Sequence, residues 1–276
     1  MPLFGVQRRQ SCAGAALAAV LVLVAGCATE PKHQPSKAGA ARSGTTYTVE
    51  PFDFDGVAGL SMSVTQRQLG GSMCPCVKVH YPADGLHNDE GVTAIDKAPL
   101  RAGDTVLGFS LGSQVISLYL AKHTPPPGVR FVLLGDTFAR NDELVARHQG
   151  IPPDIANAVT LVVREYDGWS DKPTRKASPH FELAMHNAEL GAATIHDYVR
   201  ARIEDAANVT TRRGNITAVL IPTQHLPINK ALRMLGNGTK ADHLDAEQRP
   251  LIDSAYDRPI PTPQQLADST GQQVSG

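Results

Sequence analysis

The feature that most constrains this chain is a serine between two glycines, at the junction of an expected strand and an expected helix. Residues 108–112 read Gly-Phe-Ser-Leu-Gly. The residues before them form a short apolar run, and the residues after them have apolar positions at helical spacing. A Gly-x-Ser-x-Gly segment in this setting predicts a tight turn that lifts the serine hydroxyl to the carboxyl edge of a sheet. Ser110 is therefore the candidate nucleophile, and a glycine-rich turn with no catalytic role is the alternative.

The apolar segments around this turn predict the fold. Short β-branched runs occur at residues 47–52, 77–81, 105–109, 129–134, 159–163 and 216–221. Most of them are continuous, as expected for strands buried on both faces of a parallel sheet. Helical patterns over residues 88–100, 111–122 and 178–205 lie between these runs. We expect an α/β fold with a mostly parallel central sheet and helices on both faces.

The same turn predicts a site for a negatively charged oxygen. The backbone N–H of Leu111 comes at the start of the expected helix, where it can donate to an oxyanion. A second donor is expected after the first strand, near Gly56 or Val57.

A serine nucleophile needs a base that is oriented by an acid, and these follow in the order Ser, Asp or Glu, His on this type of fold. Asp167 comes just after the run at residues 159–163 and before a glycine, so we take it as the acid. Asp171 is the alternative, although it also suits a helix cap or a turn. We expect the neighbouring Tyr166 and Trp169 to fill the core below the site.

Five histidines follow Asp167, at positions 180, 186, 196, 225 and 243. His225 follows the run at residues 216–221, whose carboxyl end should lie at the same sheet edge as Ser110. His196 lies near the end of an expected helix and is the second candidate. We therefore predict His225 as the general base that takes the Ser110 proton, with Asp167 fixing its tautomer.

The chain begins with a segment typical of export. Arg8 and Arg9 precede an uncharged run over residues 13–26, shorter than the roughly 20 residues that cross a bilayer as a helix. Residues 24–27 read Val-Ala-Gly-Cys and resemble the lipobox of bacterial lipoproteins, in which the cysteine thiol takes the diacylglycerol. We expect an exported protein, anchored to the outer face of the cell membrane through a lipidated Cys27. An ordinary secretory signal with an incidental cysteine is the alternative.

The composition divides the chain into four parts. Residues 1–26 are the expected signal peptide, and residues 27–45, which lack an apolar period, are an expected flexible tether. Residues 46–260 are the expected catalytic domain. Residues 261–276 are an expected flexible tail.

The pair Cys74 and Cys76 is separated by one proline. On a strand these side chains would point to opposite faces, so a bridge between them would be strained. We predict two buried free thiols, with a strained redox pair as the alternative.

Charge excludes one class of partner. The chain has 26 Lys and Arg against 27 Asp and Glu, a net charge of −1. Nucleic-acid binding requires clustered positive charge, so we expect no nucleic-acid partner. We also expect no cofactor and no metal.

Several motifs together resemble the PE-PPE domain of mycobacteria and their relatives, over roughly residues 75–260. They are the segments 108–112, 133–136, 166–173 (Tyr-Asp-Gly-Trp-Ser-Asp-Lys-Pro), 187–196 and 221–227 (Ile-Pro-Thr-Gln-His-Leu-Pro). The resemblance implies a cutinase-like α/β-hydrolase fold and a triad of Ser110, Asp167 and His225. It also implies either an esterase of acyl esters or a membrane-tethered acyltransferase that builds trehalose-based lipids. The chain departs from the family at residues 136–140, which read Asp-Thr-Phe-Ala-Arg where Asn-Pro and a glycine-rich loop are usual.

Two hypotheses of different classes follow. In the first, an exported serine hydrolase forms an acyl-enzyme at Ser110 and passes the acyl group to water or to a sugar hydroxyl, with an acyl ester or a glycolipid as substrate. In the second, the protein is a catalytically silent lipoprotein that binds components of the cell envelope. The intact order of Ser110, Asp167 and the following histidines favours the first.

Overall fold

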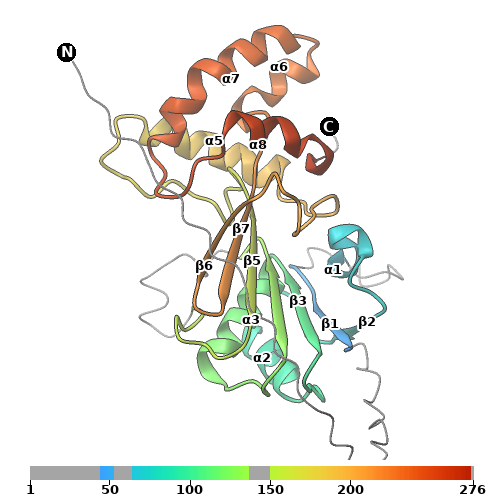
Figure 1. The fold of residues 1–276 in the computed structure, drawn as a ribbon. Helices are drawn as coiled ribbons and strands as arrows, with labels where there is room; N and C mark the ends of the chain where they lie inside the picture. Colours follow the sequence, from blue (N-terminus) through green and yellow to red (C-terminus); the bar gives the residue numbers. More distant parts are fainter. Residues whose placement is uncertain (1–43, 53–63, 137–149, 275–276) are drawn as a thin grey trace, which may run out of the picture. The chain divides into compact units, whose positions relative to one another are not determined.

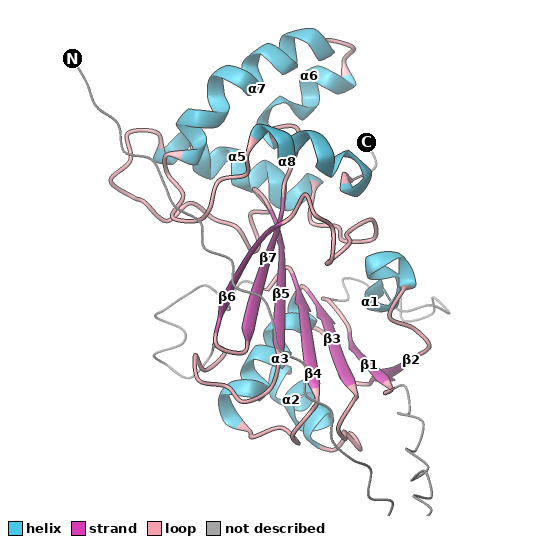
Figure 2. Ribbon diagram, in the orientation of Figure 1, coloured by secondary structure: helices cyan, strands magenta, loops and turns pink. Residues whose placement is uncertain are grey.

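The computed structural model describes residues 44–52, 64–136 and 150–274, and all structural statements below concern these ranges. Seven strands form one sheet in the order β2-β1-β3-β4-β5-β7-β6 (Figure 2). The strands are β1 (Thr46–Val49), β2 (Cys76–Val79), β3 (Thr105–Phe109), β4 (Arg130–Leu134), β5 (Val159–Arg164), β6 (Val209–Arg213) and β7 (Ile216–Ile221). Every neighbouring pair is parallel except β6 and β7. The predicted α/β fold with a mostly parallel sheet is confirmed.

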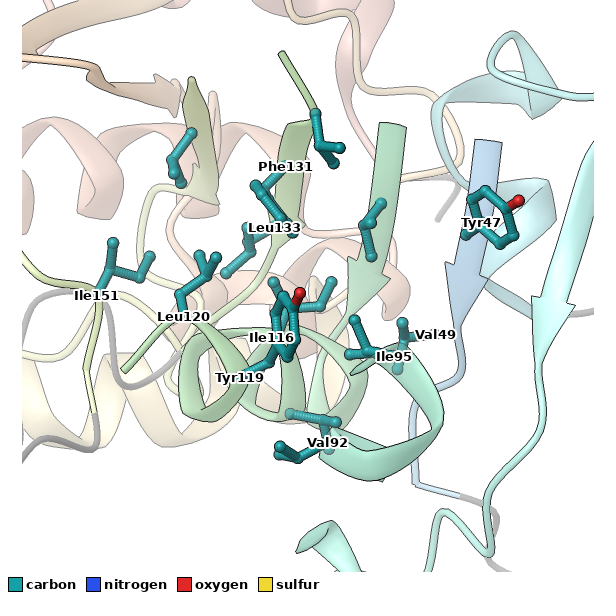
Figure 3. Packing of buried hydrophobic residues seen from close by; sticks show 14 of the residues in the cluster. Tyr47, Val49, Val92, Ile95, Ile116, Tyr119, Leu120, Phe131, Leu133 and Ile151 are labelled. Atoms are coloured by element: carbon teal, nitrogen blue, oxygen red, sulfur yellow. The ribbon is translucent and has the colours of Figure 1, made fainter. Parts of the chain in front are cut away.

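The central strands are apolar throughout because both of their faces are covered. Along β4, Phe131 and Leu133 point to one core, and Val132 and Leu134 point to another. Helices α2 (Asn88–Asp96) and α3 (Leu111–Lys122) cover the first face. Figure 3 shows their side chains packed against the strands. The second face is covered by residues from the segments 64–73 and 198–203.

A second group of helices gathers beyond the carboxyl ends of the strands (Figure 1). It contains α5 (Phe181–Thr194), α6 (Lys230–Met234), α7 (Gly238–Asp253) and α8 (Pro263–Asp268). Short helices complete the described chain, namely α1 (Val64–Arg67), η1 (Gln68–Gly71), η2 (Pro227–Asn229) and η3 (Ser269–Gln272). Among the described helices, none has both the length and the apolar character needed to cross a bilayer.

Three expectations about the elements were incomplete or wrong. Strand β6 and helix α7 were not predicted, because β6 is mostly exposed and polar and α7 contains a proline, Pro250. The helix expected over residues 178–205 ends at Thr194. The flexible tail expected over residues 261–276 is wrong for its described part, because α8 and η3 form there and the Gln272 carbonyl accepts a hydrogen bond from the buried Arg164.

The prediction of free thiols is also wrong, because Cys74 and Cys76 form a disulfide with their Cα atoms 4.6 Å apart. The prediction assumed that both cysteines lie on one strand. Only Cys76 belongs to β2, whereas Cys74 lies in the turn before it. The alternation of side chains along a strand therefore does not apply to this pair.

Candidate active site

Ser110 occupies the sharp turn between β3 and α3. Its backbone angles are φ 52° and ψ −118°, a conformation that residues other than glycine rarely adopt. The backbone N–H of Ser110 donates to the Leu134 carbonyl at 2.9 Å, which ties the turn to the end of β4. The Ser110 side chain makes no capping hydrogen bond to its own helix. The Ser110 hydroxyl is therefore not engaged in capping α3.

The two glycines of the turn are required by close backbone contacts. A Cβ atom at Gly112 would lie 2.2 Å from the Val49 carbonyl oxygen, and one at Gly108 would lie 2.6 Å from the Ile116 side chain. Helix α3 thus approaches β1 and β3 more closely than a side chain would permit. This explains why both glycines accompany the serine.

Leu111 is the first residue of α3, so its N–H has no partner within the helix. This is the position expected for an oxyanion donor. The second expected donor, near Gly56 or Val57, lies outside the described residues.

Asp167 lies just beyond β5 and is fully buried. Its Oδ1 accepts the Trp169 backbone N–H at 3.1 Å, and its Oδ2 accepts the hydroxyls of Ser170 at 2.9 Å and Tyr198 at 2.8 Å. Burial and the adjacent Asp167 carboxylate raise the pKa of Tyr198, so this hydroxyl stays protonated and remains a donor. Several hydrogen bonds thus replace water around the buried carboxylate.

The histidine that reaches Asp167 is His196. Its Nδ1 lies 2.6 Å from Asp167 Oδ2, while its Nε2 is buried and has no hydrogen-bond partner among the described residues. The imidazole stacks on Phe109, the residue before Ser110, with ring centroids 4.9 Å apart. One ring nitrogen is therefore held by the acid, and the other is available beside the serine turn.

Backbone contacts between α5 and the loop after β5 bring His196 to this position. A Cβ atom at Gly168 would lie 2.0 Å from the Ala188 carbonyl oxygen, and one at Gly191 would lie 1.9 Å from the Tyr166 carbonyl oxygen. The helix therefore lies directly on the loop that holds Asp167. At Gly135, after β4, a Cβ atom would lie 2.6 Å from the His196 ring. Gly168 and Gly191 thus allow α5 to lie on the loop, and Gly135 leaves room for the His196 ring.

The predicted pairing of Asp167 with His225 does not occur in the structure. The His225 side chain is 47% exposed, and its Nδ1 lies 3.4 Å from Asp245 Oδ2 and 3.9 Å from Asp242 Oδ1. The physical reason is that the chain after β7 turns into η2 and α6, which carries His225 toward α7. The alternative candidate, His196, takes the expected place.

His225, Asp242 and Asp245 also offer three possible metal-ligand atoms within 4.8 Å of one another. However, Arg233 already contacts Asp242 at 2.6 Å and Asp245 at 2.5 Å. A cation would have to displace this guanidinium, so the donor set suits an ion-pair cluster better than a metal site.

Asp171, the alternative acid, is held by other groups. Arg258 Nε lies 3.0 Å from Asp171 Oδ1 and 2.9 Å from Asp171 Oδ2, and the Tyr166 N–H donates to Oδ2 at 2.9 Å. Tyr166 has a φ of 64°, so the Asp171 contact stabilises an unusual backbone conformation directly before Asp167. The Asp171 carboxylate therefore holds the loop that presents Asp167.

The chain matches a known protein family. The PE-PPE domain matches residues 88–257, which is more than half of the chain. The chain belongs to the PE-PPE domain family. The resemblance noted in the sequence is thus confirmed.

Curated PE-PPE relatives of the chain occur in Mycobacterium tuberculosis. One, named Esterase PE16, is 31% identical over 205 residues, covering 63% of this chain and 38% of the relative. Another, named Diacyltrehalose acyltransferase Chp2, is 37% identical over 210 residues, covering 63% of this chain and 57% of the relative. The chain thus spans less than two thirds of the length of either relative. No solved structure matches the chain significantly.

The PE-PPE domain also contains two residues beside Asp167 that the sequence did not indicate. Tyr198 and Ser170 both donate to Asp167, yet neither belongs to a pattern that marks a catalytic group. Tyr166 is fully buried, as expected, but Trp169 is 52% exposed and its ring centroid lies 6.4 Å from that of His196. The expectation that Trp169 fills the core is therefore wrong.

Two sequence features of this PE-PPE protein fall partly or wholly outside the described residues. In the loop over residues 136–140, only Asp136 is described, and it is buried and accepts a hydrogen bond from the Ser117 hydroxyl. Cys27, the expected lipidation site, lies outside the described residues.

Proposed function

We propose that this protein is a serine enzyme of acyl esters, with Ser110 as nucleophile, His196 as general base and Asp167 as the acid that orients the base. One observation carries this proposal. His196 binds the buried Asp167 through Nδ1, and its Nε2 has no partner within the described part of the chain, while its ring stacks on the residue next to Ser110. A base oriented on one side and free on the other is what an activated serine requires.

The chemistry follows from these positions. His196 Nε2 accepts the Ser110 proton as Oγ bonds to the acyl carbon, and the Leu111 N–H donates to the oxyanion that forms. His196 then returns the proton to the leaving alcohol, which leaves an acyl-enzyme on Ser110. Water or a sugar hydroxyl then attacks the carbonyl of this ester, and His196 again accepts the proton. Asp167 holds the His196 tautomer and stabilises the imidazolium during both acylation and deacylation.

The acceptor in the second half is either water or a sugar hydroxyl. The names of the two relatives, an esterase and a diacyltrehalose acyltransferase, support one outcome each. We therefore propose an acyl ester or a trehalose-type glycolipid as substrate. Product analysis with and without a trehalose-based acceptor separates hydrolysis from transfer, because transfer yields an acylated sugar at the expense of free acid.

Labelling of the full chain by a fluorophosphonate tests the nucleophile. We expect labelling and hydrolysis of p-nitrophenyl esters, and we expect Ser110→Ala to abolish both. Ser178→Ala is the matched control, because Ser178 is half-buried and its hydroxyl contacts Ser254 and the His180 N–H, which do not belong to the proposed site. Folded wild-type protein that takes up no label would instead support a catalytically silent envelope-binding protein.

We further propose that the protein is exported and lipid-anchored through Cys27. The support is the sequence alone, with an arginine pair, an uncharged run and a small-residue stretch that ends at this cysteine. Mass spectrometry of the mature N-terminus tests this, since a diacylglycerol on Cys27 adds a defined mass.

A further inference from the structure

A cavity of about 350 Å³ lies beside the described site and is lined by none of Ser110, Asp167 and His196. Its walls come from the ends of β5 and β7, from η2 and α6, and from the last described residues of the chain. The apolar part of the wall consists of Ile195, Leu226, Pro227, Met234 and Val274. The volume falls in the range of small-molecule sites.

The surface next to this cavity is also apolar. Met234, which lines it, is 78% exposed, and the following Leu235 is 76% exposed. Large apolar side chains in water cost free energy, and a cluster of them next to an apolar cavity marks a site for an apolar ligand.

The charged residues that line the cavity are all basic. Among the described lining residues, four carry basic side chains and none is acidic. Two of the four, His225 and Arg233, face the carboxylate of Asp245. The other two, Arg164 and Lys230, are not paired with carboxylates.

Among the described residues, the side chains of Arg164 and Lys230 donate only to backbone carbonyls, and the Arg164 guanidinium also lies 5.7 Å from the centroid of the Tyr198 ring. Arg164 is 1% exposed, and its guanidinium donates to the Asp197 and Gln272 carbonyls at 2.9 to 3.1 Å. Lys230 Nζ reaches only the Thr194 carbonyl, at 3.5 Å. Within the described part of the chain, neither cation has a carboxylate in ion-pair contact. A buried arginine without such a partner favours an anion nearby.

We infer that this cavity binds a long-chain alkyl carboxylate, with the chain among the apolar residues and the carboxylate at Lys230, near Arg164. The inference stands independently of the proposed function, because it requires no catalysis.

Isothermal titration of the full chain with dodecanoate tests the inference. It is run on the Ser110→Ala variant as well as the wild type, so that binding is measured whether or not Ser110 reacts. We expect dodecanoate to bind both proteins equally, and dodecyltrimethylammonium to bind at least about tenfold more weakly, since the charge of the head group is reversed.

Two variants locate the site. Lys230→Gln should weaken dodecanoate binding about tenfold, the size of one lost charge-assisted hydrogen bond, and leave dodecanol binding unchanged. Val274→Trp fills the cavity and should remove the binding of both. Lys240→Gln is the control, because Lys240 is exposed in the first turn of α7 and does not line the cavity.

The inference is overturned if Lys230→Gln weakens dodecanoate and dodecanol equally, since the contact would then be structural. It is also overturned if dodecanoate binds Lys230→Gln and Val274→Trp as well as it binds the wild type. That result would place the ligand elsewhere, for example at Ser110.

Discussion

Six of the described histidines lie beside carboxylates, and the two that were candidates for the base, His196 and His225, differ sharply in burial. His196 is 13% exposed and contacts Asp167, which is fully buried and has no other ion-pair partner within the described residues. His225 is 47% exposed and faces Asp245, which Arg233 already neutralises at 2.5 Å. A carboxylate that is buried and free of cations can orient a histidine and stabilise its charged form, whereas one that is paired with arginine contributes less.

The loop of Asp167 and the surroundings of His225 each contain an arginine cluster, and the clusters differ in the same way. Arg258, which binds Asp171 of the Asp167 loop and also Glu165, is 1% exposed, and these carboxylates are 3% and 0% exposed. Near His225, Arg233 is 20% exposed and one of its partners, Asp242, is 62% exposed. The comparison teaches that burial, and not the presence of a His–Asp contact, separates the two neighbourhoods.

The largest expected effect comes from exchanging the two histidines for alanine. His196→Ala should lower kcat/KM for a p-nitrophenyl ester by about 10⁴-fold, because the serine loses its base. His225→Ala should change it by less than about threefold, since an exposed ion pair contributes little. Steady-state kinetics on both variants, with circular dichroism to confirm folding, measures the difference.

If His225→Ala abolished turnover and His196→Ala did not, the original prediction from the sequence would be right and the geometric assignment would be wrong. Loss in both variants would mean that the α6–α7 region contributes to the site. Either result would show that burial does not distinguish the roles of His196 and His225.

The sequence was sufficient for much of the fold because the buried strands are apolar on both faces. The runs that became β3, β4, β5 and β7 were all predicted, as was the turn at Ser110. Both candidate bases were named, but the sequence did not indicate that His196 and not His225 contacts Asp167, because the expectation for His225 depends on where the chain turns after β7. Helix α5 packs on the loop of Asp167 through Gly168 and Gly191, and no local pattern indicates this contact.

The other errors have a similar cause. Strand β6 is Val-Thr-Thr-Arg-Arg, an exposed edge strand whose pairing with β7 alone fixes it. The C-terminal segment reads as polar and flexible, yet Gln272 is fully buried because its carbonyl meets Arg164. Tertiary partners, which a single sequence does not reveal, decide these positions.

The arginine clusters give the second prediction. Arg258→Met removes the guanidinium that pairs with the buried Asp171 and leaves Glu165 with Arg249 alone, and it should lower the free energy of unfolding by about 3–5 kcal/mol. Arg233→Met, in the exposed cluster, should lower it by about 1 kcal/mol or less. Burial acts to lower the pKa of Arg258, but the carboxylates of Asp171 and Glu165 outweigh it and raise that pKa, in line with a strong pairing.

Urea unfolding of both arginine variants measures this difference. Equal losses of stability would show that exposure does not separate the two clusters. A stable Arg258→Met protein would show that the buried carboxylates tolerate the loss of their cation.

The smallest expected effect concerns the hydroxyl that Tyr198 donates to Asp167. Tyr198→Phe removes the hydrogen bond to the buried Asp167 and the acceptor of the Arg164 backbone N–H, and we expect kcat to fall about tenfold with KM unchanged. The matched control is Tyr256→Phe, because the Tyr256 hydroxyl is also buried but has no hydrogen-bond partner among the described residues. Tyr198→Phe should also lose about 2 kcal/mol of stability. A variant that stays folded, with activity reduced only in Tyr198→Phe, would show that this donor acts through the orientation of Asp167. Equal activity of the two variants would instead mean that Ser170, the Trp169 N–H and His196 suffice to hold the carboxylate.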